Sequence, residues 1–277
     1  MSTIQRPEGL PSFGSPPLNE LVLGIQFDTL GFKGFHAGEL ATRFPGYSEI
    51  SEQPFILPAF ELFGTEGNAQ AFPFPPFFQS AQRYWFRTPS TSDLVQVQPD
   101  RLLRNWTRRN DSDVYPRYET IRAKFEQDIQ IFSDFIKEKS LGAVLINQCE
   151  TSYINLIEVP MDSKSEFNLS KIFKFWSTDY KPDQSMTIED ANVSYRTVCR
   201  DEHGKPVGRL HFSIDPVIKA DASRKPFVQL NLTFRGKPKE PTAESALELI
   251  DIGRTLIVKS FASATREDMH KLWTREQ

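Results

Sequence analysis

The sequence contains few of the residues from which metal and nucleophile sites are commonly built. Among its 277 residues are two cysteines, Cys149 and Cys199, and four histidines. Two cysteines so far apart exclude a disulfide framework and a four-cysteine zinc site, so we expect two reduced, structural thiols. No histidine has the spacing to another ligand that metal motifs require, and we predict neither a metal nor a cofactor. The histidines are His36, His203, His211 and His270.

Recognisable catalytic motifs are absent as well. The chain has no Gly-x-Ser-x-Gly element, no phosphate-binding glycine loop and no Gly-x-Gly-x-x-Gly. We expect His203 in a turn and His211 on the surface of a strand, and a catalytic role is disfavoured for both. An enzyme is not excluded, since catalytic groups meet in space rather than in sequence. The sequence nevertheless favours a protein without catalytic activity.

Neither long apolar runs nor a strong charge bias is present. The 33 basic and 36 acidic residues give a net charge of -3, which provides no overall attraction to nucleic acid or to an anionic membrane. Residues 1–17 lack the pattern of a signal peptide, and no segment has about 18 uninterrupted apolar residues. We therefore expect a cytoplasmic protein. With 39% hydrophobic and 25% charged residues, the chain has the composition of a folded protein.

Periodic apolar residues predict alternating strands and helices. In the clearest helix, apolar residues recur every three or four positions from Tyr118 to Ile136. The elements expected in the first half are a strand at 21–27, a short helix at 38–44, a hairpin at 83–98 and a long helix at 116–139. Those expected in the second half are strands at 143–149 and 152–159, a short helix at 169–176, a hairpin within 188–214, a strand at 227–234 and helices at 242–261 and 266–273.

Both halves thus repeat one order of strand, short helix, aromatic hairpin and long amphipathic helix. The repeat predicts an α+β fold of two tandem β-α-β-β-(β)-α modules, whose antiparallel sheets are packed by the long helices. A flexible leader at 1–17, rich in proline, glycine and serine, precedes a first module at 18–141 and a second module at 142–277. Such modules can also pack together as one compact domain.

The most suggestive binding segment runs from Asp100 to Arg109, where arginines are interleaved with a tryptophan. Such side chains can hold phosphates and stack on a base. Residues 100–113 carry four arginines and three aspartates, so the local net charge is only +1, which disfavours nucleic acid. The alternative is a solvated face that Trp106 anchors to the core. The candidate binding residues are Gln96, Gln98, Arg101, Arg104, Asn105 and Trp106.

A second candidate surface is the segment 55–78, which is rich in phenylalanine and proline. Proline fixes φ and lacks an N–H donor, so we expect this stretch to be an extended loop. An exposed aromatic run of this kind can dock a partner protein, and its contact residues would be Phe72, Phe74, Phe77 and Phe78. The favoured alternative is that these phenylalanines cover one end of the core.

Three parts of the chain resemble a sporadically distributed family of bacterial proteins of unknown function. They are 16–27, 95–106, and 261–265 together with His270 and Trp273. The most specific is the pattern Gln-x-x-Arg-x-x-x-Asn-Trp at 98–106, and the similarity extends over essentially the whole chain. The resemblance implies a bacterial origin and a full-length architecture, but no activity, cofactor or catalytic residue. Its patchy distribution is typical of mobile or antiviral defence gene clusters.

These features favour a non-enzymatic binding or interaction protein that uses a cleft between two similar modules. We expect its partner to be another protein, in a mobile or defence-associated system, or else a small ligand that the cleft senses. Membrane contact is not expected, and nucleic acid is disfavoured. The remaining alternative is a metal-dependent nuclease or hydrolase. It has little support, because Glu119, Glu126 and Asp128 are expected on the solvated side of the long helix.

Overall fold

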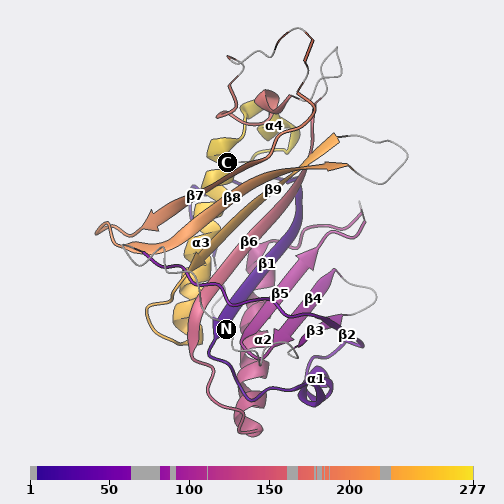
Figure 1. Cartoon of the computed structure of the whole chain (residues 1–277), viewed down its shortest axis with the longest axis vertical. Helices are drawn as coiled ribbons and strands as arrows, with labels where there is room; N and C mark the ends of the chain where they lie inside the picture. Colours follow the sequence, from indigo (N-terminus) through magenta and orange to yellow (C-terminus); the bar gives the residue numbers. More distant parts are fainter. Residues whose placement is uncertain are drawn as a thin grey trace.

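The computed structural model describes residues 5–63, 82–87, 92–110, 112–160, 168–177, 179, 183, 185–186, 188–218 and 226–276. Within these ranges, nine strands form one antiparallel sheet in the order β2-β3-β4-β5-β1-β6-β9-β8-β7 (Figure 1). The strands are β1 (Leu18–Phe27), β2 (Glu49–Pro54), β3 (Gln82–Arg87), β4 (Asp93–Gln98), β5 (Arg101–Thr107), β6 (Ile146–Glu158), β7 (Val193–Arg200), β8 (Pro206–Ile218) and β9 (Pro226–Gly236). The helices are α1 (Gly34–Ala41), α2 (Tyr118–Glu138), the 3-10 turn η3 (Leu169–Lys171), α3 (Ala243–Ala264) and α4 (Glu267–Leu272).

The centre of the sheet is the antiparallel pair β1 and β6, which lie side by side in Figure 1. Their ladder runs from Leu18 opposite Asn155 to Phe27 opposite Ile146. Outward from β1 come β5, β4, β3 and β2, and outward from β6 come β9, β8 and β7. On each side of the central pair, the strands therefore lie in the reverse of their order along the chain, within one continuous sheet.

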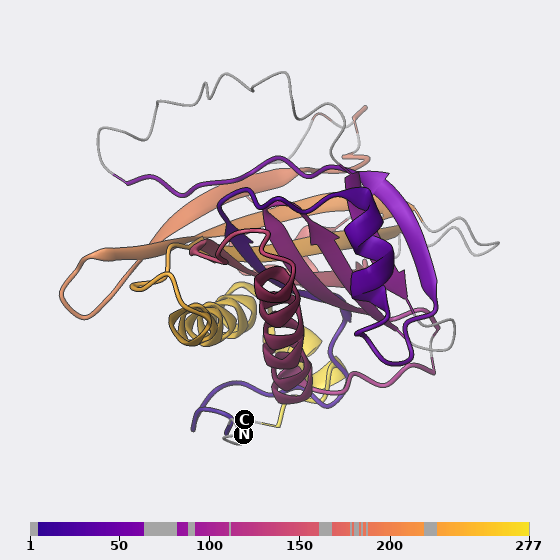
Figure 2. The same ribbon diagram turned by 90° about the horizontal axis from the view of Figure 1, so that it is seen from below.

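The two long helices cover the same face of this sheet (Figure 2). α2 lies against β5, and α3 lies against β6 and β9. The predicted apolar stripe of α2 is buried, with Ile121, Phe125 and Phe132 fully inaccessible. On α3, a glycine permits close packing, since a Cβ added to Gly253 would lie 2.5 Å from Cδ1 of Phe234. Helices packed on one face of an antiparallel sheet confirm the predicted α+β class.

The N-terminal segment, which the sequence predicts to be a flexible leader, packs against the end of the chain at residues 12–15. The backbone N–H of Gly14 donates to the carbonyl of Thr274 at 2.8 Å, and that of Glu276 donates to the carbonyl of Ser12 at 2.9 Å. Phe13 is buried, and its ring meets Phe261 edge-on at 5.3 Å. This aromatic contact anchors the segment to the core. The high proline, glycine and serine content of the segment does not predict such a contact.

Several other elements differ from their predicted form. The strands expected at 143–149 and 152–159 are one strand, because the β6 ladder continues without interruption through 150–151 on both sides. The helix expected at 169–176 is the single turn η3, which Asn168 caps. α1 begins at Gly34, four residues before its predicted start, and β2 is an additional strand that extends the sheet beyond β3.

None of the helices in the described part of the chain is long and apolar enough to cross a membrane. Cys149 and Cys199 are both buried, free thiols, as the sequence predicts. Burial raises the pKa of each thiol, so both are protonated near neutral pH and neither is a reactive thiolate.

Candidate functional site: a pocket between the two long helices

A pocket lies beneath the N-terminal segment, between α2 and α3, with the central strands of the sheet as its floor. We call it the interhelical pocket. Its volume is about 70 Å³. A single buried water needs about 10–15 Å³ of such space, so the pocket can hold several waters or a small organic group. The lining residues that matter most for its chemistry are Arg6, Tyr115, Glu119, Tyr153, Arg254 and Phe261.

Ordinary periodicity places each of these side chains. Tyr153 and Asn155 are two residues apart on β6, so both point to the face that the helices cover. Arg254 follows Ile250 by four residues and precedes Ile257 by three, which puts it on the buried stripe of α3. Glu119 lies in the first turn of α2 and faces the same pocket. The pocket is therefore assembled where the two halves of the chain meet.

Aromatic rings form part of its walls. Phe13 and Phe261 meet edge-on at 5.3 Å between ring centroids. Tyr115 packs against Trp106 of β5 at 5.2 Å. The guanidinium of Arg254 lies 5.0 Å from the ring centre of Tyr118, within the range of a cation–π contact. These walls suit a ligand with a flat apolar part.

The charged groups of the pocket are mostly positive. Arg254 is only 4% exposed, and its Nη2 donates to Oε1 of Glu119 at 2.9 Å. The buried Nε atoms of Arg254 and Arg6 have no hydrogen-bond partner among the described residues. Arg6, Arg117 and Arg254 line the pocket together with one carboxylate, Glu119, which leaves two positive charges in excess. Burial and the neighbouring charge of Arg254 both lower the pKa of Arg6.

The pocket tyrosines supply neutral hydroxyl groups. Burial raises the pKa of Tyr153 to about 12. Burial likewise raises the pKa of Tyr115, and the neighbouring Tyr153 adds to that shift. Both phenols therefore keep their protons at neutral pH and can donate hydrogen bonds. Arginine guanidinium groups beside tyrosine hydroxyls are donors that suit a carboxylate or another small oxyanion.

The six binding residues predicted from sequence lie on both faces of the sheet. Strand alternation directs Arg104 and Trp106 toward the helices, whereas Gln96, Gln98, Arg101 and Asn105 face the opposite side. All six are buried, so β5 is not the solvated face that was the alternative prediction. Of the six, Trp106 packs against Tyr115, which lines the interhelical pocket.

Arg104 is held in a buried ion pair with Asp128 of α2. Its Nε and Nη2 donate to the two carboxylate oxygens at 2.5 and 2.9 Å. Burial alone would lower the pKa of Arg104, but the hydrogen-bonded carboxylate outweighs burial and raises it. The expectation that Asp128 lies on the solvated side of the helix is wrong. Its side chain is buried and forms an ion pair with Arg104 of β5. Glu126, by contrast, is exposed.

On the opposite face, the amide residues form a connected network. Oε1 of Gln96 accepts hydrogen bonds from Arg83 at 2.7 Å and from the indole N–H of Trp85 at 2.9 Å. Nε2 of Gln96 donates to Oδ1 of Asn105 at 2.6 Å, and Asn105 in turn donates to Glu20 at 2.5 Å. The other predicted surface lies outside the described residues, since 64–81 includes Phe72, Phe74, Phe77 and Phe78.

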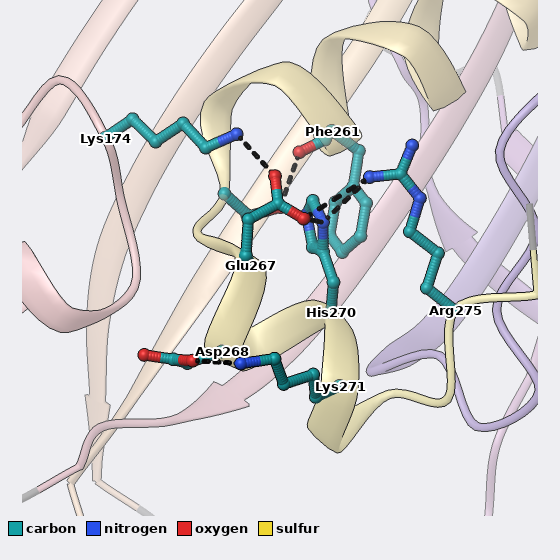
Figure 3. Close-up of polar contacts among 8 residues, drawn as sticks. Lys174, Phe261, Glu267, Asp268, His270, Lys271 and Arg275 are labelled. Atoms are coloured by element: carbon teal, nitrogen blue, oxygen red, sulfur yellow. Dashed lines mark hydrogen bonds and ion pairs between the residues drawn. The ribbon is translucent and has the colours of Figure 1, made fainter.

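A second cluster lies at the junction of α3 and α4, where Figure 3 shows His270 beside Glu267 and Arg275. Together with Thr265, it has the order of a threonine-histidine-glutamate triad. Nε2 of His270 lies 2.7 Å from Oγ1 of Thr265, and Nδ1 of His270 lies 3.2 Å from Glu267. However, Thr265 donates its proton to the carbonyl of Phe261 at 2.7 Å, and Arg275 donates to Nδ1 of His270 at 3.0 Å. His270 must therefore donate Nε2–H to Thr265, which is the tautomer that cannot act as its base.

Burial strengthens this interpretation of the cluster. Thr265 is 0% exposed and His270 is 2% exposed, so no substrate reaches the hydroxyl. Burial is the main cause that lowers the pKa of His270, which keeps the imidazole neutral. The cluster therefore joins α3 to α4 and is not a nucleophile site. Among the described residues, no three His, Cys, Asp or Glu side chains converge as metal ligands either.

Sequence reasoning missed the residues that define the pocket. One signal was available, because Arg254 interrupts the apolar stripe of α3, where a charged residue requires a partner inside the fold. Nothing in the sequence showed that the N-terminal segment would close the pocket. No protein-family model matches the chain, and no curated protein matches it. The resemblance to a bacterial family therefore stays a prediction.

Proposed function

We propose that this protein is a non-enzymatic binding protein whose ligand, a small anion with an apolar body, occupies the interhelical pocket. One observation carries the proposal: Arg254 is almost fully buried, lines the pocket and has an Nε without a hydrogen-bond partner in the described part of the chain. A buried donor without an acceptor is costly, and an anionic ligand would satisfy it.

We also propose that the pocket lies between two tandem modules, 18–141 and 142–277. The strand order supports this interpretation, since β1-β5-β4-β3 and β6-β9-β8-β7 leave the centre of the sheet in opposite directions. α2 and α3 each follow the last strand of their half and cover the same face. A site between two similar units can respond to a ligand by a small change in their packing.

The groups around the pocket favour binding over catalysis. Its carboxylate, Glu119, is neutralised by Arg254, and its tyrosines stay protonated at neutral pH. A nucleophile with an adjacent free base would be needed for covalent catalysis, and these lining residues do not provide that pair. Donors directed at an oxyanion, with aromatic walls beside them, are what a binding site for a small aromatic carboxylate requires.

A thermal-shift experiment with three matched probes tests this proposal. Benzoate, benzamide and benzylamine share one ring and differ in charge. At about 100 times its dissociation constant, a ligand stabilises the folded state by about 2.7 kcal/mol, which for a chain of this size raises Tm by roughly 5–10 °C. We expect benzoate to raise Tm and benzamide and benzylamine to have little effect.

Two variants locate the binding site. Arg254→Gln removes the charge and should weaken benzoate binding by about tenfold or more, because a hydrogen bond to a charged group contributes about 1.5–3 kcal/mol. Arg196→Gln is the matched control, since Arg196 is exposed on β7 and does not line the pocket. An equal benzoate shift in the wild type and in Arg254→Gln, or a preference for benzylamine, would refute the proposal.

A further inference from the structure

The face of the sheet that the helices leave uncovered is crossed by an extended stretch of chain, residues 55–63, which we call the crossing segment. It follows β2 and runs over the strands toward β8 (Figure 2). The side-chain amide of Gln98 in β4 forms two hydrogen bonds with the backbone of this segment. Oε1 accepts from the N–H of Ile56 at 3.1 Å, and Nε2 donates to the carbonyl of Ile56 at 2.8 Å.

The next strands continue the same kind of contact. Arg101 of β5 donates to the carbonyl of Leu57 at 3.1 Å. Gln26 of β1 accepts from the N–H of Ala59 at 2.9 Å. Arg101 also donates to Gln26 at 2.7 Å, and this hydrogen bond fixes the two side chains relative to each other. Three side chains from three strands thus bind the main chain of the segment, and such contacts do not depend on the side chains of the peptide.

One acidic residue anchors the far end. The carboxylate of Glu61 is 6% exposed and forms ion pairs with Arg209 and His211 of β8. Arg209 also donates to the carbonyl of Leu62 at 3.0 Å, and its guanidinium lies 4.9 Å from the ring centre of Phe63. In contrast, Leu57 and Phe60 are 53% and 40% exposed. Recognition therefore rests on an extended backbone and one carboxylate.

The crossing segment leaves part of this face unsatisfied. A gap of about 10 Å³ lies beneath Ala59, bordered by Gly24, Arg101 and Gln148. Nε of Arg101 and Oε1 of Gln148 are buried there and have no hydrogen-bond partner among the described residues. A peptide with serine at the position of Ala59 would bring into this gap a hydroxyl group, which can both accept from Arg101 and donate to Gln148. The segment is therefore an imperfect occupant of the face on which it lies.

We propose that this polar face of the sheet is a docking site for an extended acidic peptide segment of a partner protein, and that the crossing segment occupies it in cis. The contacts of Ile56, Leu57 and Ala59 show how the face holds a peptide backbone, and Glu61 defines the charge that it accepts. Because the crossing segment is part of the same chain, its effective concentration is high and it competes with any peptide in trans. This proposal is independent of the interhelical pocket, which lies on the opposite face.

The experiment uses a fluorescein-labelled peptide of residues 54–63 in which Leu57 and Phe60 are replaced by serine, since those two side chains are exposed. Fluorescence anisotropy is measured with the full-length wild type, with Glu61→Ala, and with Glu52→Ala as a control. Glu52 is an exposed acid of β2 that does not touch the face. We expect Glu61→Ala, whose own segment is released, to bind the peptide at least tenfold more tightly than the wild type or Glu52→Ala.

Two further arms test the chemistry of the docking site. The peptide with glutamine in place of Glu61 should bind Glu61→Ala about tenfold or more weakly, because the charge-assisted contacts to Arg209 and His211 are lost. The double variant Glu61→Ala/Arg209→Gln should lose binding to a similar degree. The proposal is overturned if Glu61→Ala, with an unchanged circular dichroism spectrum, does not bind the peptide. It is also overturned if single-stranded RNA displaces the peptide more effectively than unlabelled peptide does, or if Glu61→Ala exchanges segments between copies and becomes a dimer.

Discussion

Glu119 of α2 accepts a hydrogen bond from Arg254 of α3 at 2.9 Å, and this pair links the long helices of the two halves at the wall of the interhelical pocket. Arg254 is 4% exposed and Glu119 is 27% exposed at the side chain, so the ion pair is partly shielded from water. Its geometry leaves the Nε of Arg254 without a partner among the described residues. The arginine is thus held by Glu119 and by the ring of Tyr118, while its Nε remains able to bind an acceptor.

Replacing the carboxylate of this pair should weaken the fold and strengthen anion binding. Glu119→Gln is expected to lower the free energy of unfolding by about 1–3 kcal/mol, because Arg254 loses a charged acceptor. The same change removes the only negative charge that we find among the described pocket residues, so benzoate should bind more tightly. Urea denaturation and benzoate titration measure the two effects. Glu248→Gln, at an exposed position of α3 that does not line the pocket, is the control and should change neither.

The Arg104–Asp128 pair predicts a second contrast. Asp128→Asn removes the nearer of the two carboxylates that pair with the buried guanidinium, leaving Asp93 at 3.5 Å from Nη1, and should cost about 3 kcal/mol. Replacing both residues, as Arg104→Met/Asp128→Leu, removes both charges from the core and should recover most of that loss. Denaturant midpoints of the three proteins give the comparison. A double variant as unstable as Asp128→Asn would show that packing, rather than the unpaired charge, dominates this site.

Two glycine-to-alanine substitutions should change the stability of the protein in opposite directions. In Gly253→Ala, the new Cβ would lie 2.5 Å from the ring of Phe234, and the close approach of α3 to β9 should be lost at a cost of about 1–3 kcal/mol. In Gly38→Ala, the new Cβ meets no heavy atom within 4 Å on α1, so helix propensity should stabilise the protein by about 0.5–1 kcal/mol. Thermal unfolding distinguishes the two outcomes.

The contact between the crossing segment and β8 should depend on pH. Burial tends to raise the pKa of Glu61, but His211 and Arg209 outweigh it and the pKa is lowered from its ordinary value of 4.5. A carboxyl group whose pKa is lowered by folding stabilises the folded state above its unfolded pKa, and this stabilisation is lost as the pH falls through the folded pKa. We therefore expect the anchor to be intact at pH 7 and to be released only as the pH falls below the ordinary value of 4.5.

Amide hydrogen exchange of residues 56–62 checks this expectation, with rates corrected for the intrinsic effect of pH. In the wild type, protection of these amides should decrease as the pH is lowered below about 4.5. In Glu61→Gln, protection should be weaker at neutral pH and should not change over that interval. If the wild type keeps full protection at pH 3, the contacts of Gln98 and Gln26 hold the segment without the carboxylate.

The sequence predicts helices and strands well where an element buries one face and exposes the other, because its apolar residues then recur at a regular spacing. The stripe of α2 is correct because Ile121, Phe125, Ile129 and Phe132, which recur every three or four residues, are all buried. The segment 101–107 was harder to interpret, because its charged residues suggest a solvated surface. Both of its faces are covered, one by α2 and the other by the crossing segment, and no local pattern shows that a distant stretch will cover the second face.

The candidate site was less predictable than the fold. Gln98, Arg101 and Trp106 were selected from sequence, and the structure shows that they belong to different surfaces, because adjacent residues of a strand point in opposite directions. Arg254 and Tyr153 are about 100 residues apart and become neighbours only after the halves join at the centre of the sheet. Such a pairing depends on topology, which a single sequence without repeats of high identity does not reveal.

The pairing of β1 also has a consequence for synthesis of the chain. Val22 pairs with Asn105 on one side and with Ser152 on the other, so its two partners come 83 and 130 residues later. At about 5–20 residues per second, the second partner follows roughly 6–26 s after Val22. During that interval the most apolar strand of the sheet has an open edge on the ribosome. We expect newly made chains to need a chaperone until β6 has been translated.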